Sequence, residues 1–260
     1  MTILHISDSH LFADAEQTLL GVNTRESFEA VLDNVTRQGV EPDLIVMTGD
    51  ISQDYSAKSY QYFAERISQL NKPVFSLAGN HDELSFLKQY LCHDNLFLNK
   101  QVITEHWQVL LLNTHSKGQV YGVVTADELT WLETCLQDNP ELPTVVFMHH
   151  HPIPIDSLWL DKIGVKNAQS VTDILQAYPQ VKLCGFGHVH QTIDVQVDNI
   201  RYLSVPSTCV QFLPQSDEFS ASEERPGYRV YHCNRDGHIE VETHRVSDYS
   251  PTVNLAISGY

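Results

Sequence analysis

Residues 145–154 read VVFMHHHPIP, an apolar run that leads directly into three histidines and a proline. Four consecutive apolar residues are typical of a strand that is buried on both faces of a sheet. The histidines then stand at the end of this strand, where α/β proteins commonly bind their ligands. The stretch therefore favours an α/β fold and raises a question of chemistry, namely which of His149, His150 and His151 holds a ligand.

Similar apolar runs recur along the chain and alternate with segments of helical periodicity. The predicted strands are residues 3–7, 44–48, 74–77, 109–113, 145–148 and 182–185. The predicted helices, each with an apolar stripe on one face, are residues 24–38, 56–70, 125–137 and 170–178. Thr125 and Glu128 form a capping box at the start of the third helix. This alternation of strands and helices predicts an α/β fold.

The pattern changes after Gly187. Residues 192–208 and 228–246 each read as a β-hairpin, and the polar residues 214–227 between them read as a long surface loop. We expect a single domain over residues 1–260, with the β-rich part at about 192–246 completing a second sheet.

Composition places the chain among soluble globular proteins. Of its 260 residues 42% are hydrophobic and 19% are charged. No apolar run approaches the roughly 20 residues of a membrane span, and no basic start followed by an apolar stretch suggests a signal peptide. We therefore expect no membrane association and a cytoplasmic location.

Charge and cysteine content exclude several functions. The formal net charge of −17 argues against a nucleic-acid partner, because an acidic protein repels phosphate backbones. The five cysteines are widely separated and form no CxxC pair, which argues against a zinc ribbon or a thioredoxin-like site. Histidine is unusually frequent, with fourteen residues against sixteen lysines and arginines, and this count directs attention to metal ligands.

Residues of metal-ligand type follow five of the predicted strands, and glycine precedes them at three. They are Asp8 and His10, Asp50, Asn80 with His81 and Asp82, the three histidines 149–151, and His188 with His190. Strand ends of an α/β sheet converge on one edge, so we expect a single site. Carboxylate, imidazole and amide ligands suit hard and borderline dications, and Asp50 is the natural carboxylate to bridge two of them.

Together these residues resemble a known family. The segments SDSH, TGD, GNHD, HHHP and GHVH, from Asp8 to His190, are similar to the five motifs of the calcineurin-like metallophosphoesterases. The resemblance implies a four-layer α/β/β/α sandwich with mixed sheets and a dinuclear metal site at its edge.

Further stretches are similar to one branch of that family, the bacterial class III 3',5'-cyclic AMP phosphodiesterases. They are residues 10–32, 159–168 and 205–212. This resemblance implies a small cyclic nucleotide as substrate and hydrolysis of 3',5'-cyclic AMP to 5'-AMP. The enzymatic alternative is a broader phosphodiesterase or phosphatase acting on 2',3'-cyclic nucleotides or glycerophosphodiesters. A metal-binding scaffold without activity is the alternative from another class.

The family roles, transferred to this sequence, give seven metal ligands. One metal is expected on Asp8, His10, Asp50 and His190, and the other on Asp50, Asn80, His149 and His188. His81 is expected to be catalytic, stabilising or protonating the leaving oxygen, and Asp82 to orient it. The expected substrate contacts are His10, Asp50, Asn80, His81 and His190.

The resemblance favours Fe²⁺ or Mn²⁺ as the two divalent ions, with Zn²⁺ or Co²⁺ also compatible with these ligands. A water shared by the two ions would be deprotonated near neutral pH and attack phosphorus as hydroxide. The protein is expected to be a monomer or a homodimer.

The three histidines are not distinguished by position alone. Asp50 and Asn80 lie three residues beyond the last bulky apolar residue of their strands, which by analogy favours His151, whereas the family motif favours His149. Residues 159–168 are a candidate lining for the base pocket, in which Trp159 would stack on adenine and Asn167 would form a hydrogen bond with it.

Overall fold

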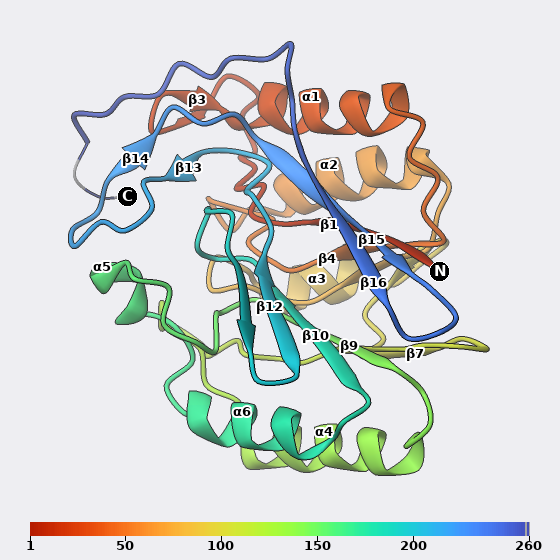
Figure 1. The fold of residues 1–260 in the computed structure, drawn as a ribbon. Helices are drawn as coiled ribbons and strands as arrows, with labels where there is room; N and C mark the ends of the chain where they lie inside the picture. Colours follow the sequence, from red (N-terminus) through yellow and green to blue (C-terminus); the bar gives the residue numbers. More distant parts are fainter. Residues whose placement is uncertain (258, 260) are drawn as a thin grey trace.

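Two mixed β-sheets pack face to face, and helices cover the outer face of each (Figure 1). This computed structural model describes residues 1–257 and 259. The first sheet has the strand order β16 (Ile239–Arg245), β15 (Gly227–Cys233), β1 (Thr2–Ile6), β4 (Leu44–Met47), β5 (Val74–Ser76) and β6 (Leu96–Phe97). The second has the order β11 (Asp194–Val197), β12 (Ile200–Ser204), β10 (Val181–Phe186), β9 (Thr144–Met148), β8 (Gln108–Leu111) and β7 (Gln101–Ile103).

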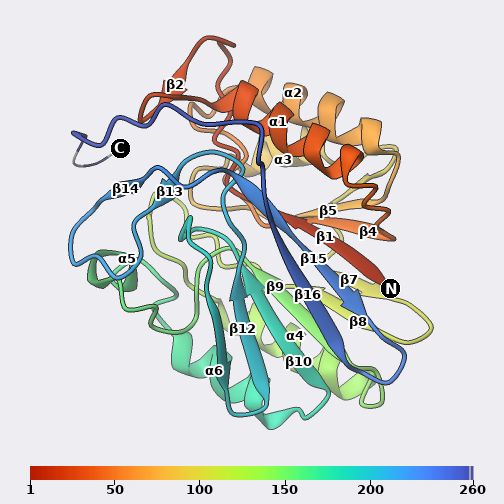
Figure 2. The ribbon, with the colours of Figure 1, turned by 45° about the horizontal axis from the view of Figure 1, so that its top comes forward.

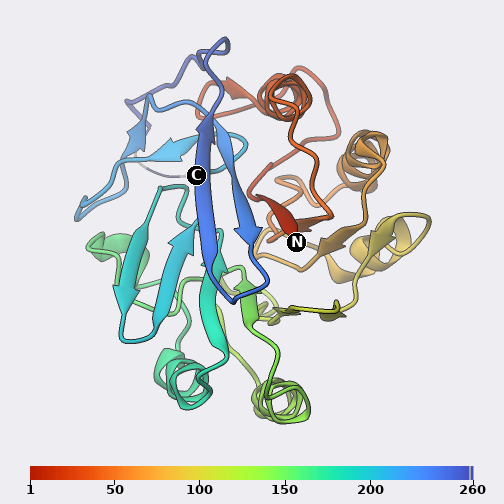
Figure 3. The same ribbon diagram turned by 45° about the vertical axis from the view of Figure 1, so that its right-hand side comes forward.

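Helices flank the two sheets on opposite sides, as Figure 3 shows by their colours. The first sheet is covered by α1 (Thr24–Arg37), α2 (Ala57–Ile67) with the 3₁₀ turn η1 (Ser68–Leu70), and α3 (Leu84–Tyr90). The second is covered by α4 (Ala126–Asp138) and α6 (Ala168–Ala177), with the short α5 (Leu158–Asp161) nearer the site. The four-layer α/β/β/α sandwich with mixed sheets is thereby confirmed.

Three apolar cores hold the layers together. One lies between the first sheet and its helices, one between the second sheet and its helices, and one between the two sheets. Phe147 and Tyr231 meet in the central core at 5.7 Å between ring centroids. Because both faces of the central strands are buried, their sequences are continuously apolar rather than alternating.

The six strands and four helices that the sequence predicts are all present, with ends that differ by a few residues. Thr125 caps α4 as predicted, its side chain accepting a hydrogen bond from the Glu128 amide. The short elements α3, α5, β6 and β7 were not predicted. Two further two-stranded sheets were also missed, β2 (Thr18–Leu19) with β3 (Val22–Asn23), and β13 (Gln211–Phe212) with β14 (Ala221–Ser222).

The expectation that residues 192–246 complete the second sheet is wrong for half of that segment. The β11–β12 hairpin joins the second sheet beside β10, but the β15–β16 hairpin joins the first sheet beside β1 (Figure 2). The reason lies in β15, whose side chains are apolar on both faces. Tyr228 and Val230 enter the core under the helices, while Tyr231 and Cys233 enter the core between the sheets.

The polar segment 214–227 is not a plain surface loop. Ala221 and Ser222 form β14, which pairs with β13, and the side chain of Phe219 packs against Phe212 at 5.4 Å between ring centroids. These apolar side chains attach the segment to the second half of the molecule. Among the helices that the structure describes, none is long and apolar enough to cross a membrane.

Candidate metal centre

The ends of five central strands lie along one edge of the sandwich and bring the predicted residues together. β1 leads to Asp8 and His10, β4 to Asp50, β5 to Asn80, β9 to His149, and β10 to His188 and His190. Hydrogen bonds tie the strand ends to one another, including Asp8 N to the Gly49 carbonyl at 3.0 Å and Gly187 N to the His149 carbonyl at 3.1 Å. The two sheets therefore share one polar site at this edge.

Five of these residues have a left-handed backbone, which is unusual for residues other than glycine. They are Asp8 (φ 57°), His10 (φ 45°), Asp50 (φ 53°), His188 (φ 68°) and His190 (φ 48°). Each such residue costs about 1–3 kcal/mol, and such strain is concentrated at functional sites. The sharp turn at each strand exit directs the side chain back into the space between the sheets.

Two glycines let the strand ends approach one another. A Cβ atom on Gly79 would lie 2.1 Å from Asp50 Oδ1 and 2.6 Å from His149 Cε1. A Cβ atom on Gly187 would lie 2.1 Å from Ser7 Oγ and 2.9 Å from Asp8 Oδ2. Glycine is required at both positions because the space is filled by the carboxylates and imidazoles of the site.

Three of the imidazoles are oriented by oxygen acceptors on their Nδ1 atoms. His10 Nδ1 lies 2.6 Å from Gln53 Oε1, His149 Nδ1 lies 2.6 Å from the Thr48 carbonyl, and His190 Nδ1 lies 2.8 Å from the Val210 carbonyl. A carbonyl oxygen can only accept, so each Nδ1 carries the hydrogen. The Nε2 atom of each neutral ring therefore presents a lone pair to the site, as in metal-binding histidines.

These lone pairs face other acceptors rather than donors. His10 Nε2 lies 3.1 Å from His190 Nε2, and His149 Nε2 lies 3.0 Å from Asn80 Oδ1 and 3.3 Å from Asp50 Oδ2. Acceptors at such distances repel one another unless a proton or a cation lies between them. The donor set therefore fits divalent metal ions.

The charges lead to the same conclusion. Asp8 and Asp50 are buried, and within residues 1–257 their only salt-bridge partners are the histidines His10, His149 and His190. Burial raises the pKa of Asp50, but the surrounding histidines, His149 foremost, together hold that pKa well below its usual value. Conversely, burial lowers the pKa of His149, but Asp50, Asp8 and the Thr48 carbonyl together raise it to about 9. The carboxylates thus hold a proton on His149, at the position where a metal would replace it.

The possible ligand atoms form overlapping groups that lie within 4.8 Å of one another. The groups of three are Asp8 with His10 and His190, Asp8 with Asp50 and His149, His10 with Asp50 and His81, and His149 with His150 and His188. His188 Nε2 is buried and has no hydrogen-bond partner among the described residues. Six of the seven predicted ligands belong to these groups, and the seventh, Asn80, lies beside His149 as described above. Asp50 is one of four residues that belong to two groups, together with Asp8, His10 and His149.

The three histidines of the opening stretch have different surroundings. His149 faces Asp50 and Asn80, as described above. His150 bonds through Nδ1 to Thr114 Oγ1 at 2.8 Å, and its ring lies 4.6 Å from that of His188. His151 is turned toward Asp161, with Nε2 3.7 Å from Oδ1. The geometry favours His149 as the ligand of this strand, whereas the analogy that favoured His151 is not supported.

The expected role of Asp82 is not what the structure shows. Its carboxylate accepts hydrogen bonds from the amides of Asp50 (2.7 Å), Ile51 (3.1 Å) and Gly79 (2.9 Å) and from the Tyr60 hydroxyl (3.0 Å). These contacts fix the main chain that carries Asp50, and none of them orients the His81 ring. Burial and the charge of Asp50 raise the pKa of Asp82 to about 7.

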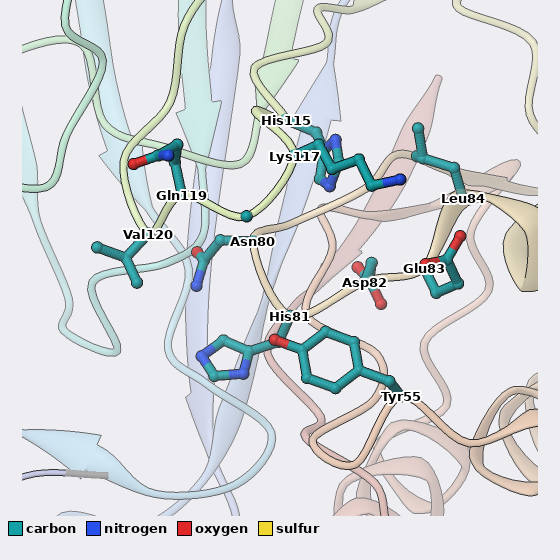
Figure 4. A pocket seen from close by; sticks show the side chains of 11 residues that line it. Tyr55, Asn80, His81, Asp82, Glu83, Leu84, His115, Lys117, Gln119 and Val120 are labelled. Atoms are coloured by element: carbon teal, nitrogen blue, oxygen red, sulfur yellow. The ribbon is translucent and has the colours of Figure 1, made fainter.

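A cavity of about 540 Å³ opens beside Asn80 and His81, the two partly exposed members of the site (Figure 4). His81 donates its backbone N–H to Asp50 Oδ1 at 2.7 Å, and its ring lies 5.1 Å from that of His10. The remaining lining residues are Tyr55, Asp82, Glu83, Leu84, His115, Lys117, Gly118, Gln119 and Val120. His81 is thus placed between the predicted metal ligands and the open cavity.

Trp159 and Asn167, considered for a base pocket, do not line this cavity. Trp159 packs against Phe212 and Phe219, with ring centroids 5.1 and 5.2 Å apart. The side-chain amide of Asn167 is bonded to the backbone of Val124 in both directions. Both residues therefore have structural roles. The cavity residues Tyr55 and Val120 were not predicted, because a single apolar residue in a polar loop carries no periodic signal.

Comparison with known proteins agrees with this geometry. The family model described as calcineurin-like phosphoesterase matches residues 1–192. The chain belongs to the calcineurin-like phosphoesterase family. A dimetal phosphatase from Danio rerio has the same fold, with a TM-score of 0.66 at 14% sequence identity. The match covers 98% of this chain and 98% of the phosphatase.

Curated relatives match almost the whole sequence. The 3',5'-cyclic adenosine monophosphate phosphodiesterase CpdA of Escherichia coli is 40% identical over 259 residues, which cover 99% of this chain and 94% of the relative. A 3',5'-cyclic-nucleotide phosphodiesterase of a Nostoc species is 36% identical over 260 residues, which cover 98% of this chain and 97% of the relative.

The different surroundings of the three histidines predict different effects on metal binding. We expect His149→Ala to lower the metal content below that of the wild type, because it removes the imidazole that faces Asp50 and Asn80. His151→Ala is the matched control and should retain the wild-type content. Elemental analysis of dialysed protein measures both, and equal losses in the two variants would show that the assignment is wrong.

The four hydrogen bonds to Asp82 predict a stability effect at a residue that is not itself a predicted metal ligand. Tyr60→Phe removes one buried donor and should lower the free energy of unfolding by about 1–3 kcal/mol. Tyr62→Phe is the control, since Tyr62 lies on the same helix and donates to Glu29 nearer the surface. Urea unfolding compares the two variants. A smaller loss for Tyr60→Phe than for Tyr62→Phe would argue against the buried network.

Proposed function

We propose that this protein hydrolyses 3',5'-cyclic AMP to 5'-AMP at a centre of two divalent metal ions. The observation that carries the proposal is a buried set of overlapping ligand groups, in which Asp8, His10, Asp50 and His149 each belong to two groups. The carboxylates of this set lack a lysine or arginine partner among the described residues. Relatives named as cyclic nucleotide phosphodiesterases, at 40% and 36% identity over nearly the whole chain, support the substrate.

The residues divide into two sets of four that share Asp50. One ion would be held by Asp8, His10, Asp50 and His190, and the other by Asp50, Asn80, His149 and His188. These oxygen and nitrogen donors, without a thiolate, suit Fe²⁺ or Mn²⁺ and also accept Zn²⁺ or Co²⁺. When bound, the ions would neutralise the phosphate, polarise its P–O bonds and lower the pKa of water toward about 7.

His81 is placed to act on the leaving group. Its backbone N–H is anchored on Asp50, and its ring lines the cavity from which substrate reaches the metal ligands. In the proposed reaction a water molecule gives up one proton to solvent, its oxygen adds to phosphorus, and the bond from phosphorus to the 3' oxygen breaks. His81 donates a proton to that oxygen, which remains part of the 5'-AMP product.

The overall charge of −17 is consistent with a small substrate. A long nucleic acid would meet the acidic surface over many phosphates, whereas a cyclic nucleotide meets only the site. There two dications and Lys117 would outweigh the negative charge of the nearby carboxylates, which are Asp8, Asp50, Asp82 and Glu83.

The proposed function is tested by metal analysis and hydrolysis on one preparation. We expect about two metal ions per chain and a kcat/KM for 3',5'-cyclic AMP that exceeds those for 2',3'-cyclic AMP and a glycerophosphodiester. A preference for either competitor would replace the proposed substrate. A metal-loaded protein that is inactive on all three phosphodiesters would indicate a scaffold.

Separate roles are expected for His81 and Asp50. His81→Ala should lower kcat by roughly 100-fold or more but retain the metal, because the substitution keeps the backbone N–H that bonds to Asp50. Asp50→Ala should lose metal and activity together. His93→Ala, at a half-exposed surface histidine, is the control for both. A His81→Ala protein with full turnover would contradict the assigned role.

A further inference from the structure

The cavity beside His81 has a polar inner part and an exposed rim, where three large apolar side chains stand beside Lys117 and Gln119. Asn80, His81 and His115 contribute polar groups to its lining. Tyr55, Leu84 and Val120 contribute large apolar side chains that are 50%, 39% and 54% exposed. A volume of about 540 Å³ is within the range of roughly 300–1,000 Å³ that is usual for small-molecule sites.

The three apolar residues come from separate segments of the chain. Tyr55 follows β4, Leu84 begins α3, and Val120 belongs to the connection between β8 and α4. The other large apolar residues of similar exposure do not line the cavity; they are Ile103, Leu158, Val195, Leu213 and Leu255. Exposed apolar side chains that gather at one cavity from three segments indicate a binding surface, whereas scattered ones do not.

Tyr55 has a further unusual property, because its backbone is left-handed with φ 54°. A bulky residue is rarely found in this conformation. The conformation places the ring beside that of His81, with 6.3 Å between centroids and 20° between planes (Figure 4). The strain is thus associated with a flat aromatic face at the mouth of the cavity.

We propose that the rim of Tyr55, Leu84 and Val120 is the base-binding part of the site, in which the purine of the nucleotide lies against the ring of Tyr55. This inference rests on the proposed function, since it is the phosphate held near Asn80 and His81 that brings the base to the rim. An apolar, aromatic rim next to a polar phosphate site matches a nucleotide, whose two ends differ in the same way. Tyr55 is then a specificity-determining residue.

Two ligands that differ only in the base separate this role from a general effect on the site. Titration calorimetry on the Mn²⁺-loaded protein would compare 5'-AMP with ribose 5-phosphate. We expect 5'-AMP to bind at least about tenfold more tightly, the size of one base–aromatic stacking contact. Tyr55→Ala should weaken 5'-AMP binding by about tenfold and leave ribose 5-phosphate unchanged, while Tyr55→Phe should keep the wild-type ratio.

Leu84→Ala is a second variant at the rim. It should reduce the ratio of the affinity for 5'-AMP to that for ribose 5-phosphate. Ile103→Ala, which removes a similarly exposed apolar side chain outside the cavity, is the matched control and should have no effect. An unchanged ratio in Tyr55→Ala would overturn the proposal. An equal loss for both ligands would also overturn it, because Tyr55 would then act through His81 rather than on the base.

The same preparation distinguishes this inference from the proposed function. One outcome is that the wild type turns over 3',5'-cyclic AMP while Tyr55→Ala leaves the ratio of the affinities for 5'-AMP and ribose 5-phosphate unchanged. This result would overturn the base-binding rim alone. A base-dependent affinity that Tyr55→Ala abolishes, without turnover of 3',5'-cyclic AMP, would support the rim and overturn the proposed reaction.

Discussion

The structure of the site depends on two buried carboxylates, Asp8 and Asp50, which lie among imidazole nitrogen atoms without a lysine or arginine partner in residues 1–257. Buried charges of this kind are costly unless they are paired or bind a metal. The imidazoles of His10, His149 and His190 cannot act as neutral donors, because their Nδ1 hydrogens are already directed to oxygen acceptors. A bound cation resolves this conflict, and the remaining features of the site follow from the need to hold its ligands in place.

The ligands are held by strand exits that are unfavourable in isolation. Left-handed backbone at Asp8, Asp50 and His188 opposes folding, and the glycines beside them add little packing of their own. The three apolar cores, and the carboxylate of Asp82 that accepts four hydrogen bonds, supply the compensating stability. Asp82 is therefore part of the framework rather than of the reacting group, although it stands next to His81 in sequence.

Sequence patterns within single segments predicted the features that depend on those segments alone. Continuous apolar runs located the central strands, helical stripes located α1, α2, α4 and α6, and the motifs placed the candidate ligands at the strand ends. The sequence did not show which sheet receives the β15–β16 hairpin, because Tyr228 and Tyr231 indicate burial on both faces but not the neighbouring strand. It also misplaced the roles of Asp82 and Trp159, since the first depends on distant backbone amides and the second on Phe212 and Phe219. Contacts between segments far apart in the chain decide such roles.

The exposure of the site residues determines from which side a substrate arrives. Asp8, His10, Asp50, His149 and His190 are at most 1% exposed, and His188 is 5% exposed, whereas Asn80 and His81 are partly open. The phosphate of a substrate therefore approaches the ligand atoms past Asn80 and His81. The rest of the substrate then lies in the adjoining cavity. Because Tyr55, Leu84 and Val120 border that cavity, the group attached to the phosphate meets an apolar surface. Tyr55 and Leu84 follow the predicted ligands Asp50 and Asn80 on the same strand connections. Only Val120, on the connection between β8 and α4, can therefore change selectivity without altering a segment that carries a predicted metal ligand.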